Sequence, residues 1–258
     1  MAVPVVLLAG GLGTRLKEET EIRPKPMIEV GGLPILWHIM KIFAAHGHKE
    51  FVICLGYKGE IIKDFFLNYS ARHGSLTVDL GSGERAHLDR SGCEDWKVHL
   101  LETGASTMTG GRVKRAAAFL GNRRFFMTYG DGVANVDINA LLAFHERTGK
   151  SATLTAVRPP ARFGGLKINN GLVEHFEEKP QLGEGWINGG YMVFEPSVAD
   201  HIEGDATFLE REPLEALADS GQLAAYQHSG FWQCMDTVRD LDLLRDLWDK
   251  GAAPWRNW

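Results

Sequence analysis

The stretch Val3-Pro4-Val5-Val6-Leu7-Leu8-Ala9-Gly10-Gly11-Leu12-Gly13-Thr14-Arg15-Leu16 indicates both the fold class and the kind of ligand. Its apolar first half, Val3 to Ala9, is typical of a buried strand. The glycines that follow let backbone N–H groups approach phosphate oxygens, because no Cβ blocks them and a positive φ costs little. A glycine-rich turn directly after a buried strand therefore predicts a phosphate-binding loop.

The two most common phosphate loops do not match this stretch. A Walker A loop needs Gly-Lys-Ser/Thr after its spacing, and a dinucleotide-binding fingerprint needs a third glycine where Leu16 stands. Two cations distinguish the loop instead: Arg15 directly behind the glycines and Lys25 between two prolines. The planar guanidinium of Arg15 and the compact ammonium of Lys25 are suited to bind phosphate oxygens. The alternative is a glycine turn flanked by two solvated cations that bind no ligand.

Short apolar runs alternate with helical patterns in the first half of the chain, and this βαβα order predicts an α/β fold with a mostly parallel central sheet flanked by helices. Strands are predicted at Val3–Ala9, Phe51–Leu55, Val98–Leu101 and Arg124–Tyr129, with helices at Ile35–Phe43, Ile61–Tyr69 and Arg112–Leu120. The second half is richer in strands, at Ala152–Val157, Leu172–Phe176, Ile187–Phe194 and Leu223–Gln227, with helices at Glu210–Asp219 and Val238–Trp248.

Length and composition favour a single domain. The 258 residues, of which 44% are hydrophobic, can bury a full core without disulfides or a structural metal. No Pro/Gly/Ser-rich linker or repeat divides the chain, so we expect one domain over residues 1–258, with one lobe at about 1–150 and a smaller, β-rich lobe at about 151–258. The polar stretch Gly81–Glu94 predicts an exposed excursion.

Charge and cysteine content exclude several classes of protein. A net charge of -5 provides no basic field for a nucleic-acid backbone, so no nucleic-acid partner is expected. Cys54, Cys93 and Cys234 show no CxxC spacing and suggest neither disulfides nor zinc, which fits a reducing cytoplasm. The apolar start lacks a basic flank and is too short to span a bilayer, so no membrane association is expected.

Two aspartates are candidates for a metal site. Asp131 follows the predicted strand Arg124–Tyr129, and ligands of parallel sheets gather beyond the carboxyl ends of strands. Asp236 precedes Thr237 and the last predicted helix, where by itself it would be read as the helix N-cap. Their oxygens suit Mg²⁺, a hard cation that commonly takes one or two carboxylates together with substrate phosphates.

Gly-Gly-Leu-Gly-Thr-Arg followed by Lys-Pro resembles the signature of the sugar-1-phosphate nucleotidyltransferases. Four further matches extend the resemblance along nearly the whole chain: Gly130-Asp131-Gly132, Glu177-Glu178-Lys179-Pro180, Ile187-Asn188-Gly189-Gly190 and Trp232-Gln233-Cys234-Met235-Asp236-Thr237. The resemblance implies a Rossmann-like nucleotidyltransferase fold whose smaller lobe binds the sugar.

The resemblance also implies roles for individual residues. Arg15, Lys25 and Asp131 would be catalytic, and Asp131 and Asp236 would bind Mg²⁺. The nucleotide would be bound by Leu8, Ala9, Gly10, Gly11, Leu12, Gly13, Thr14, Arg15, Lys25, Thr109, Gly110, Gly111, Arg112 and Gly130. The sugar phosphate would be bound by Gly164, Glu178, Lys179 and Asn188.

Three more segments resemble the branch of this family that uses CTP and glucose 1-phosphate and forms CDP-glucose and pyrophosphate: 34–41, 107–112 and 253–255. Thymidylyl, uridylyl or guanylyl transfer on the same fold remains an alternative, as does a sugar-nucleotide sensor without catalysis. The resemblance further implies a homo-oligomer, with a hexamer as one form, and a place in bacterial surface-polysaccharide synthesis.

Overall fold

In the computed structural model, the described residues are 2–11, 13, 16–87, 89, 91–159, 165–169, 172–177 and 185–258. Their main element is an eight-stranded sheet with the order β13-β10-β14-β8-β1-β4-β7, in which β15 also pairs with β10. Its strands are β1 (Val5–Leu8), β4 (Glu50–Leu55), β7 (Lys97–Glu102), β8 (Phe125–Tyr129), β10 (Ala152–Val157), β13 (Ile187–Asn188), β14 (Met192–Phe194) and β15 (Leu223–His228).

The parallel part of the sheet places the start of the chain at its centre. Strand β1 pairs in parallel with β4 on one side and with β8 on the other, and Leu8 lies opposite both Cys54 and Tyr129. Strand β7 adds to β4, also in parallel. Because these strands end at the same edge, the glycine-rich turn after β1 and Asp131 after β8 are neighbours in space.

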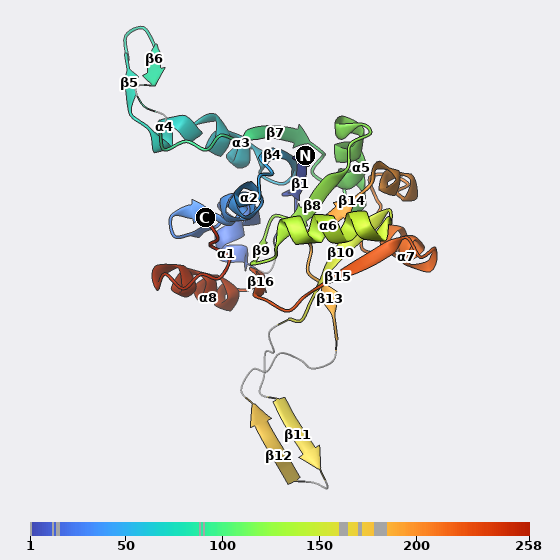
Figure 1. Cartoon of the computed structure of the whole chain (residues 1–258). Coiled ribbons are helices and arrows are strands. Elements are labelled where there is room, and N and C mark those ends of the chain that lie inside the picture. The colour runs from blue at the N-terminus through green and yellow to red at the C-terminus, as the bar shows by residue number, and fades with distance from the viewer. Residues whose placement is uncertain are drawn as a thin grey trace.

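Helices cover both faces of the sheet, since its central strands are buried on both sides (Figure 1). On one face, Val5 and Leu7 belong to a core shared with α2 (Ile35–Ala45), α3 (Gly59–Leu67), α6 (Ile138–Thr148) and α8 (Val238–Asp249). On the other face, Val6 and Leu8 pack into a core with α5 (Thr109–Leu120), η3 (Pro196–His201) and α7 (Glu212–Asp219). This arrangement confirms the expected α/β fold with a mixed, mostly parallel central sheet.

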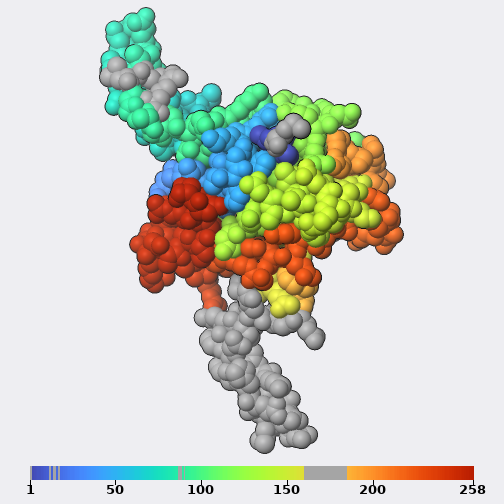
Figure 2. All heavy atoms as spheres, in the orientation of Figure 1, coloured from blue at the N-terminus to red at the C-terminus, as the bar shows by residue number. Residues whose placement is uncertain are grey.

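The remaining elements are short. Four two-stranded sheets are formed by β2 (Glu29–Val30) with β3 (Leu33–Pro34), β5 (Leu76–Val78) with β6 (Arg85–His87), β9 (Gly132–Ala134) with β16 (Trp232–Cys234), and β11 (Gly165–Asn169) with β12 (Leu172–Glu177). The other helices are α1 (Lys17–Thr20), η2 (Lys25–Met27) and α4 (Tyr69–His73). The β5–β6 hairpin projects from the body, and residues 79–86 are exposed, as expected for the polar excursion (Figure 2).

Two local expectations need correction. Ile187–Phe194 is not one strand, because Gly190 and Tyr191 have positive φ angles of 74° and 45° and separate β13 from β14. Helix α6 was not expected, although Asp137 caps its start by accepting from the Ala140 N–H at 2.9 Å and Gly149 ends it in the left-handed region. Among the described residues, no helix is long and apolar enough to cross a membrane.

The end of the chain packs on α2 through a cluster of aromatic rings. His38 on this helix is fully buried, and its ring lies edge-on to Trp248 at 4.6 Å between centroids. Its Nε2 is 2.8 Å from the Val30 carbonyl oxygen, and its Nδ1 accepts from Trp255 Nε1 at 3.4 Å. These bonds satisfy the neutral ring, and burial lowers the pKa of His38 to about 4.

Candidate active site

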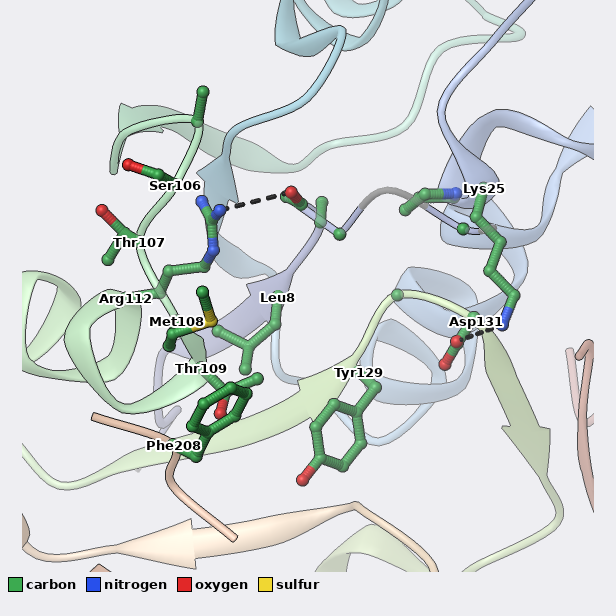
Figure 3. Close-up of a pocket in the computed structure, with 17 residues that line it drawn as sticks. Leu8, Lys25, Ser106, Thr107, Met108, Thr109, Arg112, Tyr129, Asp131 and Phe208 are labelled. Atoms are coloured by element: carbon green, nitrogen blue, oxygen red, sulfur yellow. Dashed lines mark hydrogen bonds and ion pairs between the residues drawn. The ribbon is translucent and has the colours of Figure 1, made fainter. Parts of the chain in front are cut away.

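A cavity of about 750 Å³ opens beyond the carboxyl ends of β1 and β8 (Figure 3). Its wall combines the glycine-rich turn, the segment leading into α5 and the end of β8. The lining residues are Leu8, Ala9, Gly10, Gly11, Gly13, Lys25, Pro26, Ala105, Ser106, Thr107, Met108, Thr109, Arg112, Tyr129, Gly130, Asp131 and Phe208. Most residues expected to bind the nucleotide therefore share one cavity.

Arg112 supports the glycine-rich turn from behind. Its side chain is buried, with Nη1 donating to the Leu55 carbonyl at 2.7 Å and to Thr103 Oγ1 at 2.6 Å. Its Nη2 donates to the Gly10 carbonyl at 3.2 Å (Figure 3). A Cβ on Gly10 would lie 2.2 Å from Arg112 Cζ. An alanine at position 10 would therefore have to displace the hydrogen-bonded guanidinium packed against it.

The other glycines of the site meet different needs. Gly13 has φ +62°, and among the described residues no atom lies within 4 Å of the position of a Cβ on Gly11, so Gly11 faces open space there. The Gly130 N–H donates to the Leu8 carbonyl at 3.0 Å, which ties the ends of β8 and β1 together. Gly110 and Gly111 let the start of α5 approach the backbone of Thr207 and Asp205, respectively.

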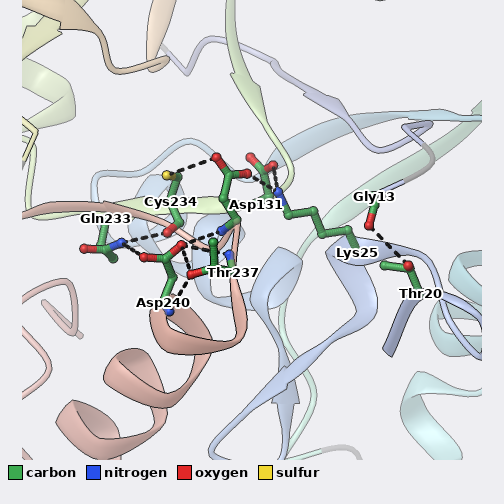
Figure 4. A network of polar contacts seen from close by, with 9 residues as sticks. Gly13, Thr20, Lys25, Asp131, Gln233, Cys234, Thr237 and Asp240 are labelled. Atoms are coloured by element: carbon green, nitrogen blue, oxygen red, sulfur yellow. Dashed lines mark hydrogen bonds and ion pairs between the residues drawn. The ribbon is translucent and has the colours of Figure 1, made fainter. Parts of the chain in front are cut away.

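Lys25 and Asp131 line one end of the cavity, and Asp236 joins them through its contact with Lys25; Lys25 and Asp131 are labelled in Figure 4. Lys25 Nζ lies 2.7 Å from Asp131 Oδ2 and 2.6 Å from Asp236 Oδ1. The Lys25 side chain is 13% exposed, and those of Asp131 and Asp236 are 30% and 24% exposed. Burial lowers the pKa of Lys25, but attraction by Asp131 and hydrogen bonds with both carboxylates outweigh burial and raise it above its ordinary value.

Local structure explains how this group assembles. Lys25 opens the 3₁₀ turn η2, which Pro26 and Met27 anchor in the core. Asp131 follows β8 after the single residue Gly130, and the Met235 N–H donates to the Asp131 carbonyl at 2.8 Å. Pairing of β9 with β16 continues this link, so the segment before Asp236 is tied to the segment that carries Asp131.

The carboxylates of Asp131 and Asp236 are suited to a magnesium ion whose coordination shell is completed by substrate phosphates and water. Among the described residues, no group of three or more His, Cys, Asp or Glu side chains could hold a metal by itself. Two carboxylates that meet at one point are nevertheless the usual protein share of a Mg²⁺ site, since phosphates and water supply the other oxygens. The expected ligands Asp131 and Asp236 are therefore adjacent, and their role as ligands stays a prediction.

Asp236 is not the N-cap of the last helix, which corrects the interpretation suggested by its position alone. Thr237 is the N-cap of α8, and a capping box with Asp240 satisfies the start of the helix. The Asp236 carboxylate instead contacts Lys25 Nζ and accepts from Cys234 Sγ at 3.6 Å. Burial, followed by the charge of Asp236, raises the pKa of the Cys234 thiol to about 12, so this thiol stays protonated as a donor.

Sequence reasoning missed Tyr129, which lines the cavity, and Glu210, which is hydrogen-bonded to Tyr129. Tyr129 Oη donates to Glu210 Oε1 at 2.7 Å, and Thr109 Oγ1 donates to Glu210 Oε2 at 2.6 Å. Burial, followed by the charge of Glu210, raises the pKa of the Tyr129 phenol. Tyr129 stands directly before Gly130, a position that could have indicated its part in the site; Glu210 had no such signal.

Six of the expected site residues lie outside the described part of the chain: Leu12, Thr14, Arg15, Gly164, Glu178 and Lys179. Their roles stay predictions. Asn188 is described, and its Oδ1 accepts from the Gly190 N–H at 2.9 Å. This bond shapes the turn between β13 and β14 beside Tyr129.

The sequence is similar to known proteins over nearly its whole length. Residues 4–241 match the family model described as nucleotidyl transferase. The chain is 53% identical over 254 residues to glucose-1-phosphate cytidylyltransferase of Salmonella typhimurium, covering 98% of both chains. It is 44% identical over 254 residues to a probable glucose-1-phosphate cytidylyltransferase of Bacillus subtilis, covering 98% of this chain and 99% of the relative.

Solved structures with lower identity share the fold. UDP-glucose pyrophosphorylase complexed with UDP-glucose superposes with a TM-score of 0.69 at 16% identity, covering 97% of this chain and 100% of the other. HddC from Yersinia pseudotuberculosis gives a TM-score of 0.69 at 22% identity, covering 95% of this chain and 99% of the other. At these identities the likeness concerns the arrangement of the elements alone.

Proposed function

The chain belongs to the nucleotidyl transferase family, and we propose that it transfers the cytidylyl group of CTP to glucose 1-phosphate, forming CDP-glucose and pyrophosphate. The observation that carries the proposal is the 53% identity to a glucose-1-phosphate cytidylyltransferase over 98% of both chains. The convergence of Lys25 with two aspartates at one end of a large cavity supports the same chemistry, because phosphoryl transfer needs cations and metal ligands held together.

The proposed reaction is an in-line attack of a sugar-phosphate oxygen on the α-phosphorus of CTP. The new bond joins that oxygen to the α-phosphorus, and the bond between the α-phosphorus and the oxygen that bridges the α- and β-phosphates breaks, so that this oxygen leaves with pyrophosphate. The nucleophile is already an anion, so the site needs to overcome charge repulsion and align two phosphates rather than remove a proton. Lys25 provides a buried positive charge for this purpose, and Arg15 is proposed to provide a second.

Asp131 and Asp236 would hold Mg²⁺, which neutralises phosphate charge when bound. The ammonium of Lys25 keeps the two carboxylates together, so the protein holds the ligand set before substrate arrives. When a triphosphate binds and the carboxylates hold Mg²⁺, the phosphate oxygens would offer the Lys25 ammonium new anionic partners. The same side chain thus organises the ligands and neutralises substrate charge.

The two substrates are proposed to occupy different lobes of one nucleotidyltransferase domain. The nucleotide would lie along the backbone at Gly11 and beside the start of α5, within residues 1–150. The sugar phosphate would be bound from residues 151–258 by Gly164, Glu178, Lys179 and Asn188. The position of Asn188 supports this placement, because its Oδ1 accepts from the Gly190 N–H and Gly190 lies against the ring of Tyr129, which lines the cavity.

A pyrophosphate-release assay tests the proposal when CTP, dTTP, UTP and GTP are each combined with several sugar 1-phosphates. CTP with glucose 1-phosphate is expected to give the highest kcat/KM. A higher value for another nucleotide would reassign the base while keeping the reaction class. Binding without any pyrophosphate release would favour a non-catalytic sensor.

The proposal extends to the setting of the enzyme. We expect a homo-oligomer, with a hexamer as one form, located in the cytoplasm and supplying sugar nucleotides for surface polysaccharides. Cys54, Cys93 and Cys234 are free thiols, which is consistent with a reducing compartment. Light scattering after size-exclusion chromatography measures the mass, and a monomeric mass would refute the oligomer.

A further inference from the structure

Asp240, in the first turn of α8, receives four hydrogen bonds from the segment that carries Asp236 (Figure 4). Its Oδ2 accepts from the Asp236 N–H at 3.1 Å, the Thr237 N–H at 2.8 Å and Thr237 Oγ1 at 2.9 Å. Its Oδ1 accepts from Gln233 Nε2 at 3.0 Å. One carboxylate thus contacts residues on both sides of Asp236.

Helix capping accounts for only part of this arrangement. A capping box needs the N3 side chain to accept from the N-cap backbone, which is the bond from the Thr237 N–H. The Asp236 N–H lies one residue before the N-cap, so its bond to Asp240 adds nothing to the capping of α8. The bond from Gln233, which is 5% exposed and whose Nε2 also donates to the Cys234 carbonyl at 2.8 Å, likewise lies outside the cap.

The bonds to Asp240 complete a clamp on the backbone of Asp236. Before Asp236, the chain is fixed by the pairing of β16 with β9 and by the Met235 N–H to Asp131 carbonyl bond. After it, the chain is fixed by Asp240. Because the backbone of Asp236 is held on both sides, its carboxylate is held in contact with Lys25 Nζ. Asp131, on the segment after β8, contacts the same Nζ atom.

We propose that Asp240 is a positioning residue that fixes Asp236 opposite Asp131 and thereby sets the metal affinity of the nucleotide complex. The inference rests on the proposed function, in which these two aspartates hold the cation. A hydrogen bond to a charged group is worth more than a neutral one, so a single carboxylate with four donors holds the segment tightly. Misplacement of a reacting or ligating group by about 1 Å can cost on the order of a hundredfold in rate.

The chain offers two controls that separate positioning from helix capping. Thr237→Ala removes the N-cap hydroxyl but leaves the backbone N–H groups of residues 236 and 237 bonded to Asp240. Asp137→Ala removes the side-chain cap of α6, where Asp137 accepts from the Ala140 N–H at 2.9 Å. Asp137 does not line the cavity and, within the described part of the chain, contacts no proposed metal ligand, so its loss measures the effect of an uncapped helix away from the metal site.

Mn²⁺ binding in the presence of CTP provides a readout that does not depend on turnover, because free aqueous Mn²⁺ is measured directly by electron paramagnetic resonance. Asp240→Ala is expected to weaken Mn²⁺ binding by on the order of tenfold, the equivalent of one charged hydrogen bond. Thr237→Ala should weaken it less than about twofold, and Asp137→Ala should leave it unchanged. In turnover, Asp240→Ala should lower kcat while the KM of glucose 1-phosphate changes less than about twofold.

Equal Mn²⁺ affinities for Asp240→Ala and Asp137→Ala would overturn the inference. If Asp240→Ala does not fold, Asp240→Asn replaces it. Its single amide oxygen can accept from the Asp236 and Thr237 N–H groups or from Gln233 Nε2, but not from both sides. The Mn²⁺ affinity of Asp240→Asn should therefore fall below that of Thr237→Ala, and the reverse order would overturn the inference. Asp131→Asn tests the underlying function separately. If Asp131→Asn binds Mn²⁺ with CTP as tightly as the wild type, the metal assignment fails, and the role of Asp240 fails with it.

Discussion

Lys25→Met removes a buried ammonium that lies within 2.7 Å of two carboxylates and leaves Asp131 and Asp236 facing each other. Breaking a buried ion pair by removing one partner costs about 3–5 kcal/mol. The lower end of this range applies here, because the carboxylates are 30% and 24% exposed and water reaches part of their surface. A loss of about 3 kcal/mol corresponds to a decrease in Tm of roughly 6–12 °C for a chain of this size.

Magnesium should restore part of this loss, because a divalent cation can take the place of the ammonium between the two carboxylates. Calorimetry of Lys25→Met with and without millimolar Mg²⁺ measures the effect. The Tm gain on adding Mg²⁺ should be larger for Lys25→Met than for the wild type, in which Lys25 already occupies the position. Cytidylyl transfer by the variant should remain strongly impaired, since Mg²⁺ does not replace the phosphate contact proposed for Lys25.

Lys41→Met is the matched control. Lys41 is 19% exposed and pairs with a single carboxylate, that of Glu94, at 3.1 Å. Because Lys41 holds one carboxylate and not two, its loss should lower the Tm less than the loss of Lys25, and Mg²⁺ should raise the Tm of this variant no more than that of the wild type. The reasoning is refuted if Lys25→Met is as stable as the wild type, or if Mg²⁺ raises the Tm of the two lysine variants equally.

Four further predictions follow from the fold and the site. Asp131→Asn should lower kcat and raise the Mg²⁺ concentration needed for half-maximal activity more than it raises the KM of glucose 1-phosphate; unchanged kcat and Mg²⁺ dependence would contradict the metal role. Lys179→Ala should raise the KM of glucose 1-phosphate more than that of CTP, and equal effects in steady-state kinetics would contradict the proposed division of the site. Gly10→Ala should destabilise the protein by about 2 kcal/mol in urea unfolding, because its Cβ would displace the buried guanidinium of Arg112; a loss below ~0.5 kcal/mol would show that this side chain moves freely. The pKa of His38 is about 4 in the folded state and 6.5 ordinarily, so the unfolded state takes up the proton first as the pH decreases. The free energy of unfolding should therefore be fully retained above pH 6.5 and should fall by about 3 kcal/mol as the pH decreases to 4. In urea unfolding, His38→Gln should make the free energy of unfolding nearly constant across this range, and an unchanged pH profile would rule out His38 as the cause.

The sequence alone determined the elements whose signal is local. Apolar runs predicted β1, β4, β7 and β8 to within a few residues, because a central parallel strand is buried on both faces and reads as a continuous apolar run. The glycine-rich turn and the position of Asp131 after β8 followed from the same pattern, since parallel strands bring their carboxyl ends to one edge. Helix α6 also has local signals at both ends, in the N-cap Asp137 and in Gly149.

Only the tertiary structure decided which of these local features meet. Lys25 contacts side chains 106 and 211 positions later, and the identity of such partners depends on the packing of the whole sheet. The same dependence explains why Arg112 binds the backbone behind the glycine turn and why Glu210 joins Tyr129 beside the cavity. Hydrogen bonds between distant segments leave no periodicity in the sequence, because each requires only one suitable side chain at a point that the folded backbone brings within about 3 Å.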